Sequence, residues 1–252
     1  MLKAFGFSGP EYVGLCSEEQ KAYPHVLPGD FLSMESLEKA ENCLNIPESD
    51  DYRHLVLILS GMLHSHDEYA GNGIGDDIYF DTMSDSFIWA ELHRRLTGKI
   101  GLRETSWLLL HINLELFRLG RLQFQKSRTP DSFTPFVESE EVIGIHIPDI
   151  GPLEYEECLS SLERARSFYR KDIPFVCDSW LLDPELSKVL SENSNILKFQ
   201  SLFDIVAVDK SNPQCHQRVF EYSERKNTTL QKRILEEEKK GSVFGVGYGI
   251  MR

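Results

Sequence analysis

The stretch from residue 141 to 170 joins a mostly apolar strand to an amphipathic helix through a short turn, and this order limits the folds open to the chain. The strand pattern covers Val142–Ile147, and the turn 148–152 holds two prolines and a glycine. The helix pattern over Glu154–Arg170 gathers its apolar residues on one stripe. A strand that leads directly into a helix leaves unpaired main-chain groups at one place, where many folds hold a ligand. We therefore expect the functional site near this turn.

Hydrophobic spacing divides the chain into a helical first part and a mixed second part. Apolar residues at helical spacing predict helices over Ser33–Leu44, Tyr52–His64, Asp76–Thr97 and Arg103–Phe117. Later segments predict strands over Leu119–Gln125, Val142–Ile147, Pro174–Asp178, Ile196–Val208, Gln217–Tyr222 and Gly241–Met251. Further helices are predicted over Glu154–Arg170, from Asp183 onward and over Thr228–Lys240. The predicted fold class is α+β, with a helical half (1–115) packed on a mixed, twisted β-sheet with flanking helices (116–252).

Charge and composition exclude several classes of partner. The net charge of −13 argues against nucleic acid and against an anionic membrane surface, because both bind clustered Lys and Arg. No apolar run approaches the roughly 20 residues of a membrane span, and no signal-peptide pattern opens the chain. The five scattered cysteines indicate reduced thiols. We expect a cytoplasmic protein, and the sequence leaves its oligomeric state open.

Three short motifs outside the turn are predicted to have structural rather than chemical roles. The run His64-Ser65-His66-Asp67 could chelate zinc, but it lacks the further ligands of such a site and is expected to be a polar helix end, so no metal is predicted. The pattern Gly71-x-Gly73-x-Gly75 follows a helix rather than a strand, which indicates a loop. The glycines of Gly245-x-Gly247-x-Gly249 strip one face of a strand for close packing or for a ligand, and packing is the favoured interpretation.

Several longer motifs resemble a bacterial family of acyltransferase domain-containing proteins. The resemblance covers nearly all of the chain beyond about residue 50. The matching stretches are Trp107–His111, Phe117–Phe124, Gly144–Pro148, Gly151–Leu153, Phe175–Pro184, Ser194–Gln200, Thr229–Gln231 and the final glycine-rich strand. The resemblance implies a helical N-acyltransferase N-terminal domain joined to a GNAT-like C-terminal domain.

The resemblance also implies an activity, which is the transfer of an acyl group from acyl-CoA to an amine. In GNAT-like folds acyl-CoA binds where two central parallel strands diverge, with pantetheine along one strand and pyrophosphate at the next helix. Here those strands would be Val142–Ile147 and Pro174–Asp178. The implied cofactor-binding residues are Gly144, Ile145, Ile147, Gly151 and Leu153.

Three side chains near the expected divergence are candidates for catalysis. His146 titrates near neutrality, so it is the candidate general base, although a lone strand histidine is more often structural. Asp178 and Ser179 would border the acceptor side. A hydrolase built on Cys177, His146 and Asp178 is a weaker alternative, because no nucleophile elbow accompanies the cysteine.

The turn departs from the usual phosphate loop of the fold. The Gln/Arg-x-x-Gly-x-Gly/Ala pattern is missing, and Pro152 removes one amide donor. Residues 131–163 hold nine acidic residues and no Lys or Arg, so cations for a pyrophosphate must come from elsewhere in the chain, and Arg118, Arg121 and Lys188 are examples. The acidic charge would favour a cationic small-molecule amine as acceptor. The alternative function is a non-catalytic GNAT-like module that binds a small molecule or a protein.

Overall fold

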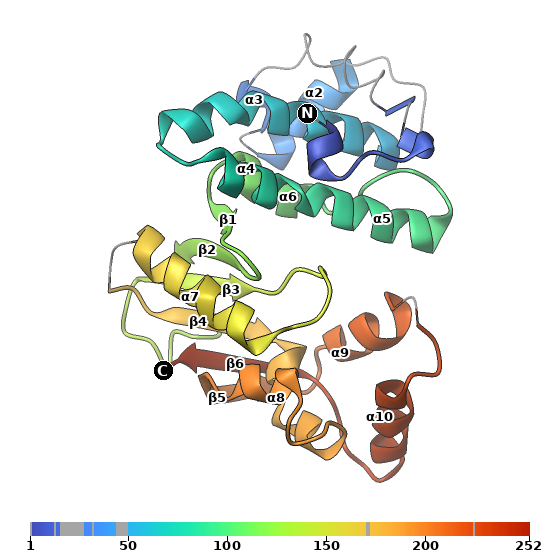
Figure 1. Cartoon of the computed structure of the whole chain (residues 1–252), viewed down its shortest axis with the longest axis vertical. Helices are drawn as coiled ribbons and strands as arrows, with labels where there is room; N and C mark the ends of the chain where they lie inside the picture. The colour runs from blue at the N-terminus through green and yellow to red at the C-terminus, as the bar shows by residue number, and fades with distance from the viewer. Residues whose placement is uncertain are drawn as a thin grey trace. The chain divides into compact units, whose positions relative to one another are not determined.

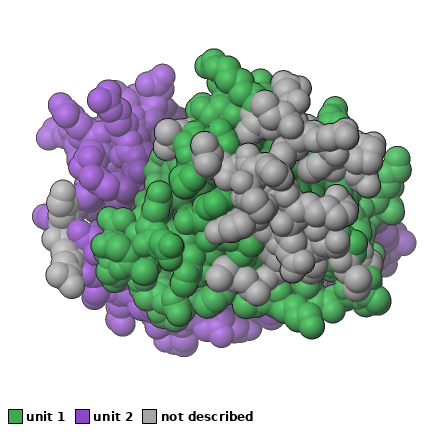
Figure 2. Space-filling view, turned by 90° about the horizontal axis from the view of Figure 1, so that it is seen from above, with its two compact units in different colours: residues 1–119, 148–150 green, residues 120–147, 151–252 purple. Residues whose placement is uncertain are grey.

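The structure is a computed structural model that describes residues 2–12, 14–15, 28–31, 33–43, 50–169, 172–223 and 225–252 (Figure 1). It divides into two compact units, coloured separately in Figure 2. Unit 1 comprises residues 1–119 and 148–150, and unit 2 comprises residues 120–147 and 151–252. The predicted boundary at residue 115 lies close to the end of the first stretch of unit 1.

The regular elements in the described residues of unit 1 are helices and one short strand. Its elements are η1 (Leu2–Phe5), η2 (Pro10–Tyr12), η4 (Pro28–Phe31), α2 (Met34–Cys43), α3 (Asp50–Gly71), α4 (Asp76–Met83), α5 (Asp85–Thr97), α6 (Thr105–Ile112) and β1 (Leu116–Arg118). Helix α3 is central, because its stretch Leu55–Leu59 is fully buried on every side. A helix that is apolar all round is buried all round.

Two predicted helices of this half end or break where the sequence pattern continues. The predicted helix Asp76–Thr97 is two helices that meet at Ser84. The predicted helix Arg103–Phe117 ends at Ile112, because Leu114 takes a left-handed φ of 58° and the chain then enters β1. Apolar spacing continues through both points, so it does not reveal either one. By contrast, Gly98 ends α5 with a φ of 72°, as predicted from the sequence.

A buried carboxylate joins α5 to α6 inside unit 1. Asp85 accepts hydrogen bonds from the indole nitrogens of Trp89 (3.1 Å) and Trp107 (2.8 Å), and His111 Nε2 lies 3.2 Å from the same oxygen. The side chains of Asp85 and His111 are 3% and 0% exposed. Because burial of a charge is costly unless its hydrogen bonds are made, this cluster fixes the packing of the two helices.

Unit 2 contains a five-stranded part of a sheet with helices around it. Its elements are β2 (Gln123–Arg128), β3 (Glu141–His146), α7 (Tyr155–Tyr169), β4 (Phe175–Ser179), η5 (Trp180–Leu182), η6 (Pro184–Lys188), α8 (Asn195–Gln200), β5 (Phe203–Asp209), α9 (Gln214–His216), the π-helical turn η7 (Gln217–Glu221), α10 (Thr229–Lys239) and β6 (Val246–Met251). The strand order is β2-β3-β4-β6-β5. Only β3 and β4 run parallel among these neighbours. The α+β class and the GNAT-like mixed sheet are confirmed.

Two predicted strands of this half are wrong in whole or in part. The predicted strand Ile196–Val208 begins as α8, because the Ser194 hydroxyl accepts the N–H of Leu197 and caps a helix start. Strand β5 begins only at Phe203. The predicted strand Gln217–Tyr222 is the π-helical turn η7, closed by the bond from Tyr222 N–H to the carbonyl of Gln217.

Alternation assigns the side chains of the sheet to two faces. We call one of them the loop face, because Phe133 and Val137 of the loop between β2 and β3 pack there on Val142 and Val176. Tyr248 of β6 lies on the same face, with its ring 5.5 Å from that of Phe133. Residues two apart along a strand share a face, so His146 and Asp178 also belong to the loop face.

The opposite face of β6 carries the glycines, which allow η5 to pack against bare main chain. A Cβ atom built on Gly247 would lie 2.2 Å from the carbonyl oxygen of Leu182, and one on Gly249 would lie 2.8 Å from Leu182 Cδ1. No side chain fits at these distances. The glycine pattern therefore serves close packing, as the sequence interpretation favoured.

We expect Gly247→Ala to destabilise the protein, because the new methyl group meets main-chain atoms that cannot rotate away. The loss should be about 1–3 kcal/mol, the range for overpacking, measured as the free energy of unfolding in urea. Gly71→Ala is the matched control, since a Cβ there has no neighbour within 4 Å. Equal stabilities of the two variants would contradict the packing assigned to Gly247.

Candidate active site

The two parallel strands of unit 2 separate before either of them ends. Their pairing runs through Ile143↔Phe175 and Gly144↔Val176, whereas β3 continues to His146 and β4 to Ser179. In a parallel ladder the next two bonds would join Asp178 N–H to the carbonyl of Ile145 and Ile147 N–H to the carbonyl of Asp178. Within the described part of the chain, Ile147 N–H makes no hydrogen bond. The strands diverge where the sequence predicted.

Each strand is held in this position by its outer neighbour. On β3, His146 still pairs with Gln123 of β2, and on β4, Ser179 still pairs with Gly247 of β6. The divergence therefore does not come from fraying of the strand ends. It leaves two ordered main-chain edges facing each other without a ladder between them, an arrangement that can pair with an extended ligand.

Polar side chains form one row across the loop face at the level of the divergence. Gln123 of β2 is directly opposite His146, and Asp178 of β4 is directly opposite Tyr248 of β6. Extending the register Gly144↔Val176 by two residues places His146 opposite Asp178 across the divergence. The fold thus brings together two of the three predicted catalytic residues on one face.

His146 is oriented by a hydrogen bond along the sheet. Its Nε2 lies 3.2 Å from Oε1 of Gln125, a hydrogen bond between neighbouring strands that fixes the direction of the imidazole ring. Gly144 lies beneath the ring, since a Cβ built there would be 3.4 Å from Nε2. A Cβ atom at this position would make only ordinary van der Waals contacts, and the cofactor-binding role of Gly144 stays a prediction.

Asp178 is exposed to solvent, yet desolvation raises the pKa of its carboxyl group above the usual value. A hydrogen bond from its own N–H opposes this rise, with a smaller effect. Desolvation also raises the pKa of Tyr248, and the charges of Asp209 and Asp178 raise it further.

Ser179 and Cys177 lie on the opposite face of β4 from Asp178. The Ser179 hydroxyl is buried and accepts the N–H of Leu181, which caps η5. Cys177 is fully buried, and this burial raises the pKa of its thiol well above the usual value. A buried neutral thiol on the far face from His146 is a poor nucleophile, so the geometry does not support the cysteine hydrolase. The catalytic role of Ser179 stays a prediction.

The turn before α7 is held by a buried arginine. Arg121, 7% exposed, donates from Nε to the carbonyl of Pro152 (3.0 Å) and from Nη2 to that of Gly151 (3.1 Å). Gly151 has a φ of 96°, which favours glycine. Leu153 follows, and the first amides of α7 have no carbonyl partner within the helix.

Arg121, one of the three proposed cations, lies at this turn. The Arg118 side chain donates to Ser84 Oγ in unit 1 (3.1 Å), and Lys188 pairs with Glu185 (2.6 Å). The charge of Arg121 also acts on Cys158 in the first turn of α7. Burial raises the pKa of that thiol to about 11, the charge of Arg121 opposes the rise, and the charges of Glu157 and Glu154 add to it. The charge of Arg121 and the charges of these acids therefore both act at the helix start.

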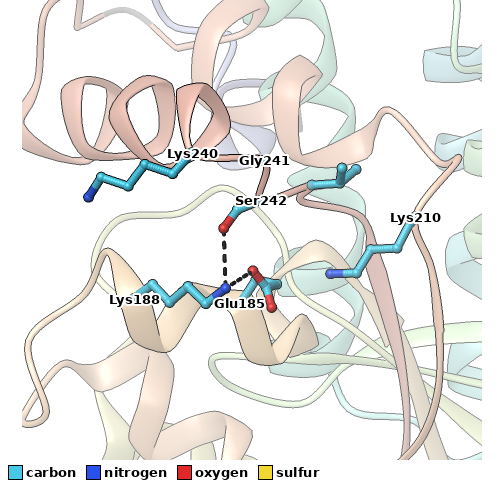
Figure 3. A pocket seen from close by; sticks show the side chains of 7 residues that line it. Glu185, Lys188, Lys210, Lys240, Gly241 and Ser242 are labelled. Carbon is cyan, nitrogen blue, oxygen red and sulfur yellow. Dashed lines mark hydrogen bonds and ion pairs between the residues drawn. The ribbon is translucent and has the colours of Figure 1, made fainter.

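A recess of about 360 Å³ elsewhere in unit 2 contains three lysines. Its lining residues are Glu185, Lys188, Lys210, Lys240, Gly241, Ser242 and Val243 (Figure 3). Each of its ammonium groups is paired with a carboxylate. Lys188 contacts Glu185 (2.6 Å), and Lys240 contacts Glu237 (2.7 Å). Lys210 lies 2.8 Å from both oxygens of the buried Asp183. Since these pairs leave the recess without net positive charge, it is not a phosphate site.

The predicted polar motif His64–Asp67 lies within α3, which continues to Gly71. His66 Nε2 lies 3.0 Å from Asp76 Oδ1, an exposed pair that ties α3 to α4. Over the described ranges of the chain, no three His, Cys, Asp or Glu side chains gather as metal ligands. Nor do these ranges contain a helix with the length and apolar character needed to cross a membrane.

Comparison with protein families gives two matches that together cover most of the chain. Residues 116–251 match the GNAT-like C-terminal domain, and residues 26–114 match the N-acyltransferase N-terminal domain. The chain therefore belongs to the acyltransferase family built from these two domains. The family predicted from the sequence motifs is confirmed. A comparison with curated proteins gives no match.

Solved structures similar to this chain are acyltransferases with bound acyl-CoA or CoA. One, in complex with decanoyl-CoA and teicoplanin, has 25% identity and a TM-score of 0.69 over 80% of this chain and 66% of that chain. The present chain thus spans just under two thirds of that protein. Another, in complex with CoA and 10C-teicoplanin, has 21% identity and a TM-score of 0.70 over 97% of this chain and 80% of that chain, a likeness of fold.

Sequence reasoning missed three members of the polar row and its surroundings, namely Gln123, Gln125 and Tyr248. The two glutamines alternate with apolar residues on β2, which is ordinary for a half-buried strand. Their importance follows only from the register that places Gln123 opposite His146. The sequence shows Tyr248 as a large side chain between glycines. It does not show that Tyr248 lies opposite Asp178, which follows only from the pairing of β4 with β6.

We expect Asp178→Asn to stabilise the protein at neutral pH, because it removes a carboxylate that the fold desolvates. A raised pKa in the folded state means that the wild type loses stability relative to the variant as pH rises through that pKa. The difference should vanish below the unfolded-state pKa, about 3.9. Urea unfolding between about pH 4 and pH 8 measures this trend.

Asp209→Asn is the control of opposite sign. Hydrogen bonds from Ser211 lower the pKa of Asp209, so its carboxylate adds stability that is present at neutral pH and lost as pH falls. If Asp178→Asn lowered stability at neutral pH, as Asp209→Asn should, the carboxylate of Asp178 would stabilise the fold. It would then be a structural residue and not a desolvated group at the candidate site.

Proposed function

We propose that this protein is an acyl-CoA-dependent N-acyltransferase, which moves an acyl group from the CoA thioester to an amine of a small molecule. The observation that carries the proposal is the divergence of β3 and β4, which leaves the N–H of Ile147 unpaired opposite Asp178. The family supports the same chemistry. We also propose a cytoplasmic location, in keeping with the buried free thiols of the described cysteines.

In this proposal the pantetheine arm lies along the edge of β3. Its amide groups take the place of the missing strand partner, so they hydrogen-bond to Ile147 N–H and the carbonyl of Ile145. The thioester then lies beside Gly144 and His146. The pyrophosphate lies at the first amides of α7, after Gly151 and Leu153, where the helix dipole and Arg121 offset the nearby acids.

His146 acts as the general base in the proposed reaction. Its imidazole takes one proton from the acceptor ammonium, and the freed amine attacks the thioester carbonyl, forming the C–N bond. The C–S bond then breaks, and the second proton on nitrogen passes to the departing thiolate, giving an amide and free CoA. Asp178, across the divergence, stabilises the cationic acceptor and the protonated imidazole by its negative charge.

The acceptor is proposed to be a cationic small molecule with a primary amine. The acids of residues 131–163 and the charge of Asp178 favour a positive partner. Similar solved acyltransferases are complexed with the glycopeptide teicoplanin, which supports an acceptor larger than a simple amine.

The alternative is a GNAT-like module that binds acyl-CoA or a related ligand without catalysis. Pro152 at the turn and the exposed acids of the first turn of α7 favour weak phosphate binding. A protein of this kind would bind at the divergence but would transfer no acyl group to any amine. Binding and turnover must therefore be measured separately.

We expect acetyl-CoA or decanoyl-CoA to raise the melting temperature of the protein, because a ligand that binds only the folded state stabilises it. At about 100 times its Kd, a ligand adds about 2.7 kcal/mol to the free energy of unfolding. Differential scanning fluorimetry with ATP as the control for phosphate charge measures the effect. An unchanged melting temperature at millimolar acyl-CoA would remove the basis of the proposal.

We expect His146→Gln to lower kcat by about 10²–10⁴, the usual contribution of a general base, while the acyl-CoA-induced shift in melting temperature persists. Glutamine keeps a donor for Gln125 but has no basic lone pair. His216→Gln is the control, because His216 pairs with Glu238 beside α10 and far along the chain from the divergence. Full activity of the His146 variant would exclude the histidine as base.

A further inference from the structure

A fully buried carboxylate lies just beyond the end of β4. Asp183 follows η5, four residues after Ser179, and is 0% exposed. One of its oxygens accepts the N–H of Glu185 (3.0 Å), and the other accepts the N–H of Gly245 (2.6 Å). Lys210 Nζ lies 2.8 Å from both oxygens. Two main-chain donors and one ammonium group therefore satisfy a charge that would otherwise be costly to bury.

The partners of this carboxylate come from segments that are far apart in the sequence. Gly245 directly precedes β6, and Lys210 directly follows β5. Because the end of β4 is paired with the start of β6, the bond between Asp183 and Gly245 continues the attachment of β4 to β6 beyond the ladder. We call the Asp183 carboxylate, together with the N–H groups of Glu185 and Gly245, the strand-end clasp.

The main chain around the strand-end clasp is closely packed. A Cβ atom built on Gly245 would lie 2.1 Å from the carbonyl oxygen of Asp209. Gln200 donates from Nε2 to the carbonyls of Leu181 (3.0 Å) and Asp183 (2.9 Å). The main chain that carries the carboxylate is therefore fixed by its own hydrogen bonds, and the carboxylate in turn holds the start of β6.

A buried ion pair is by itself weak evidence for stability. The desolvation penalty can exceed the attraction between the charges, and apolar side chains of similar volume are often equally stable. A carboxylate differs from an apolar side chain in supplying two acceptor oxygens in fixed directions. At Asp183 each oxygen accepts one main-chain N–H, so the side chain sets the relative positions of the strand ends.

We propose that Asp183 is a positioning residue for the acyl-CoA site, which keeps the end of β4 attached to β6 and so holds the divergence of β3 and β4 open. This inference rests on the proposed acyltransferase function. The edge of β3 can pair with pantetheine only while β4 does not pair with that edge. The ladder between β4 and β6 reaches Ser179 and Gly247, and the strand-end clasp adds a hydrogen bond between the same two segments after the ladder ends.

The test compares Asp183→Asn with Lys210→Met. Asparagine has one acceptor oxygen in place of two, so it breaks one main-chain bond of the strand-end clasp, whereas Lys210→Met removes the counter-charge and leaves both main-chain bonds. Decanoyl-CoA should bind to the Asp183 variant about tenfold more weakly, the value of one hydrogen bond, measured as Kd by titration calorimetry. Lys210→Met should keep the wild-type Kd, although it should melt at a lower temperature because a buried carboxylate loses its cation.

Amide hydrogen exchange of the ligand-free proteins tests the same inference without the cofactor. The amides of residues 179–180 and 245–247 should exchange faster in Asp183→Asn than in the wild type, whereas Lys210→Met should leave their exchange unchanged. Unchanged exchange in Asp183→Asn would overturn the inference, because the strand end would then be held without the carboxylate.

The two measurements also separate positioning from stability. Weaker binding in both variants, in proportion to their melting temperatures, would show that Asp183 acts only on stability and would overturn the inference. An Asp183→Asn variant that does not fold would overturn it as well. If the wild type binds no acyl-CoA, the proposed function fails, and the exchange rates then decide whether Asp183 holds the end of β4.

Discussion

The site depends on one constraint in the sheet, which is that β3 and β4 are each paired more firmly on their outer side than with each other. β2 holds β3 through His146, and β6 holds β4 through Ser179. The inner ladder stops at Gly144 and Val176. The fold therefore maintains an open main-chain edge that would otherwise be costly in a buried sheet, and everything proposed for the ligand follows from that edge.

The chemistry of the site follows from where the open edge meets the polar row. Because the register brings His146 and Asp178 to opposite sides of the divergence, a base and a carboxylate flank any guest held there. The desolvation that raises the pKa of Asp178 is a cost to the fold, as is the buried amide of Gln123, which is unpaired within the described residues. Both of these costs fall on the loop face at the level of the divergence, and perturbed groups of this kind are known from functional sites.

The sequence predicted the parts of the fold that local signals control. The strand-turn-helix from Val142 onward, the helix start at Asp183 and the helix from Thr228 were all predicted. Apolar alternation gave the wrong prediction at residues 196–200, where the Ser194 hydroxyl caps a helix. Of the candidate site, His146 and Asp178 were predicted because they lie at strand ends. Gln123 and Tyr248 were not, because their roles depend on pairing between segments far apart in the chain.

Amide hydrogen exchange at the divergence tests the central claim most directly. In the ligand-free protein, Ile147 N–H should exchange rapidly while the amides of β3 that pair with β2 remain protected. Addition of acyl-CoA should slow the exchange of Ile147 while leaving β5 and β6 unchanged. Strong protection of Ile147 before any ligand is added, or no change at this amide on saturation with acyl-CoA, would contradict an open strand edge that receives the cofactor.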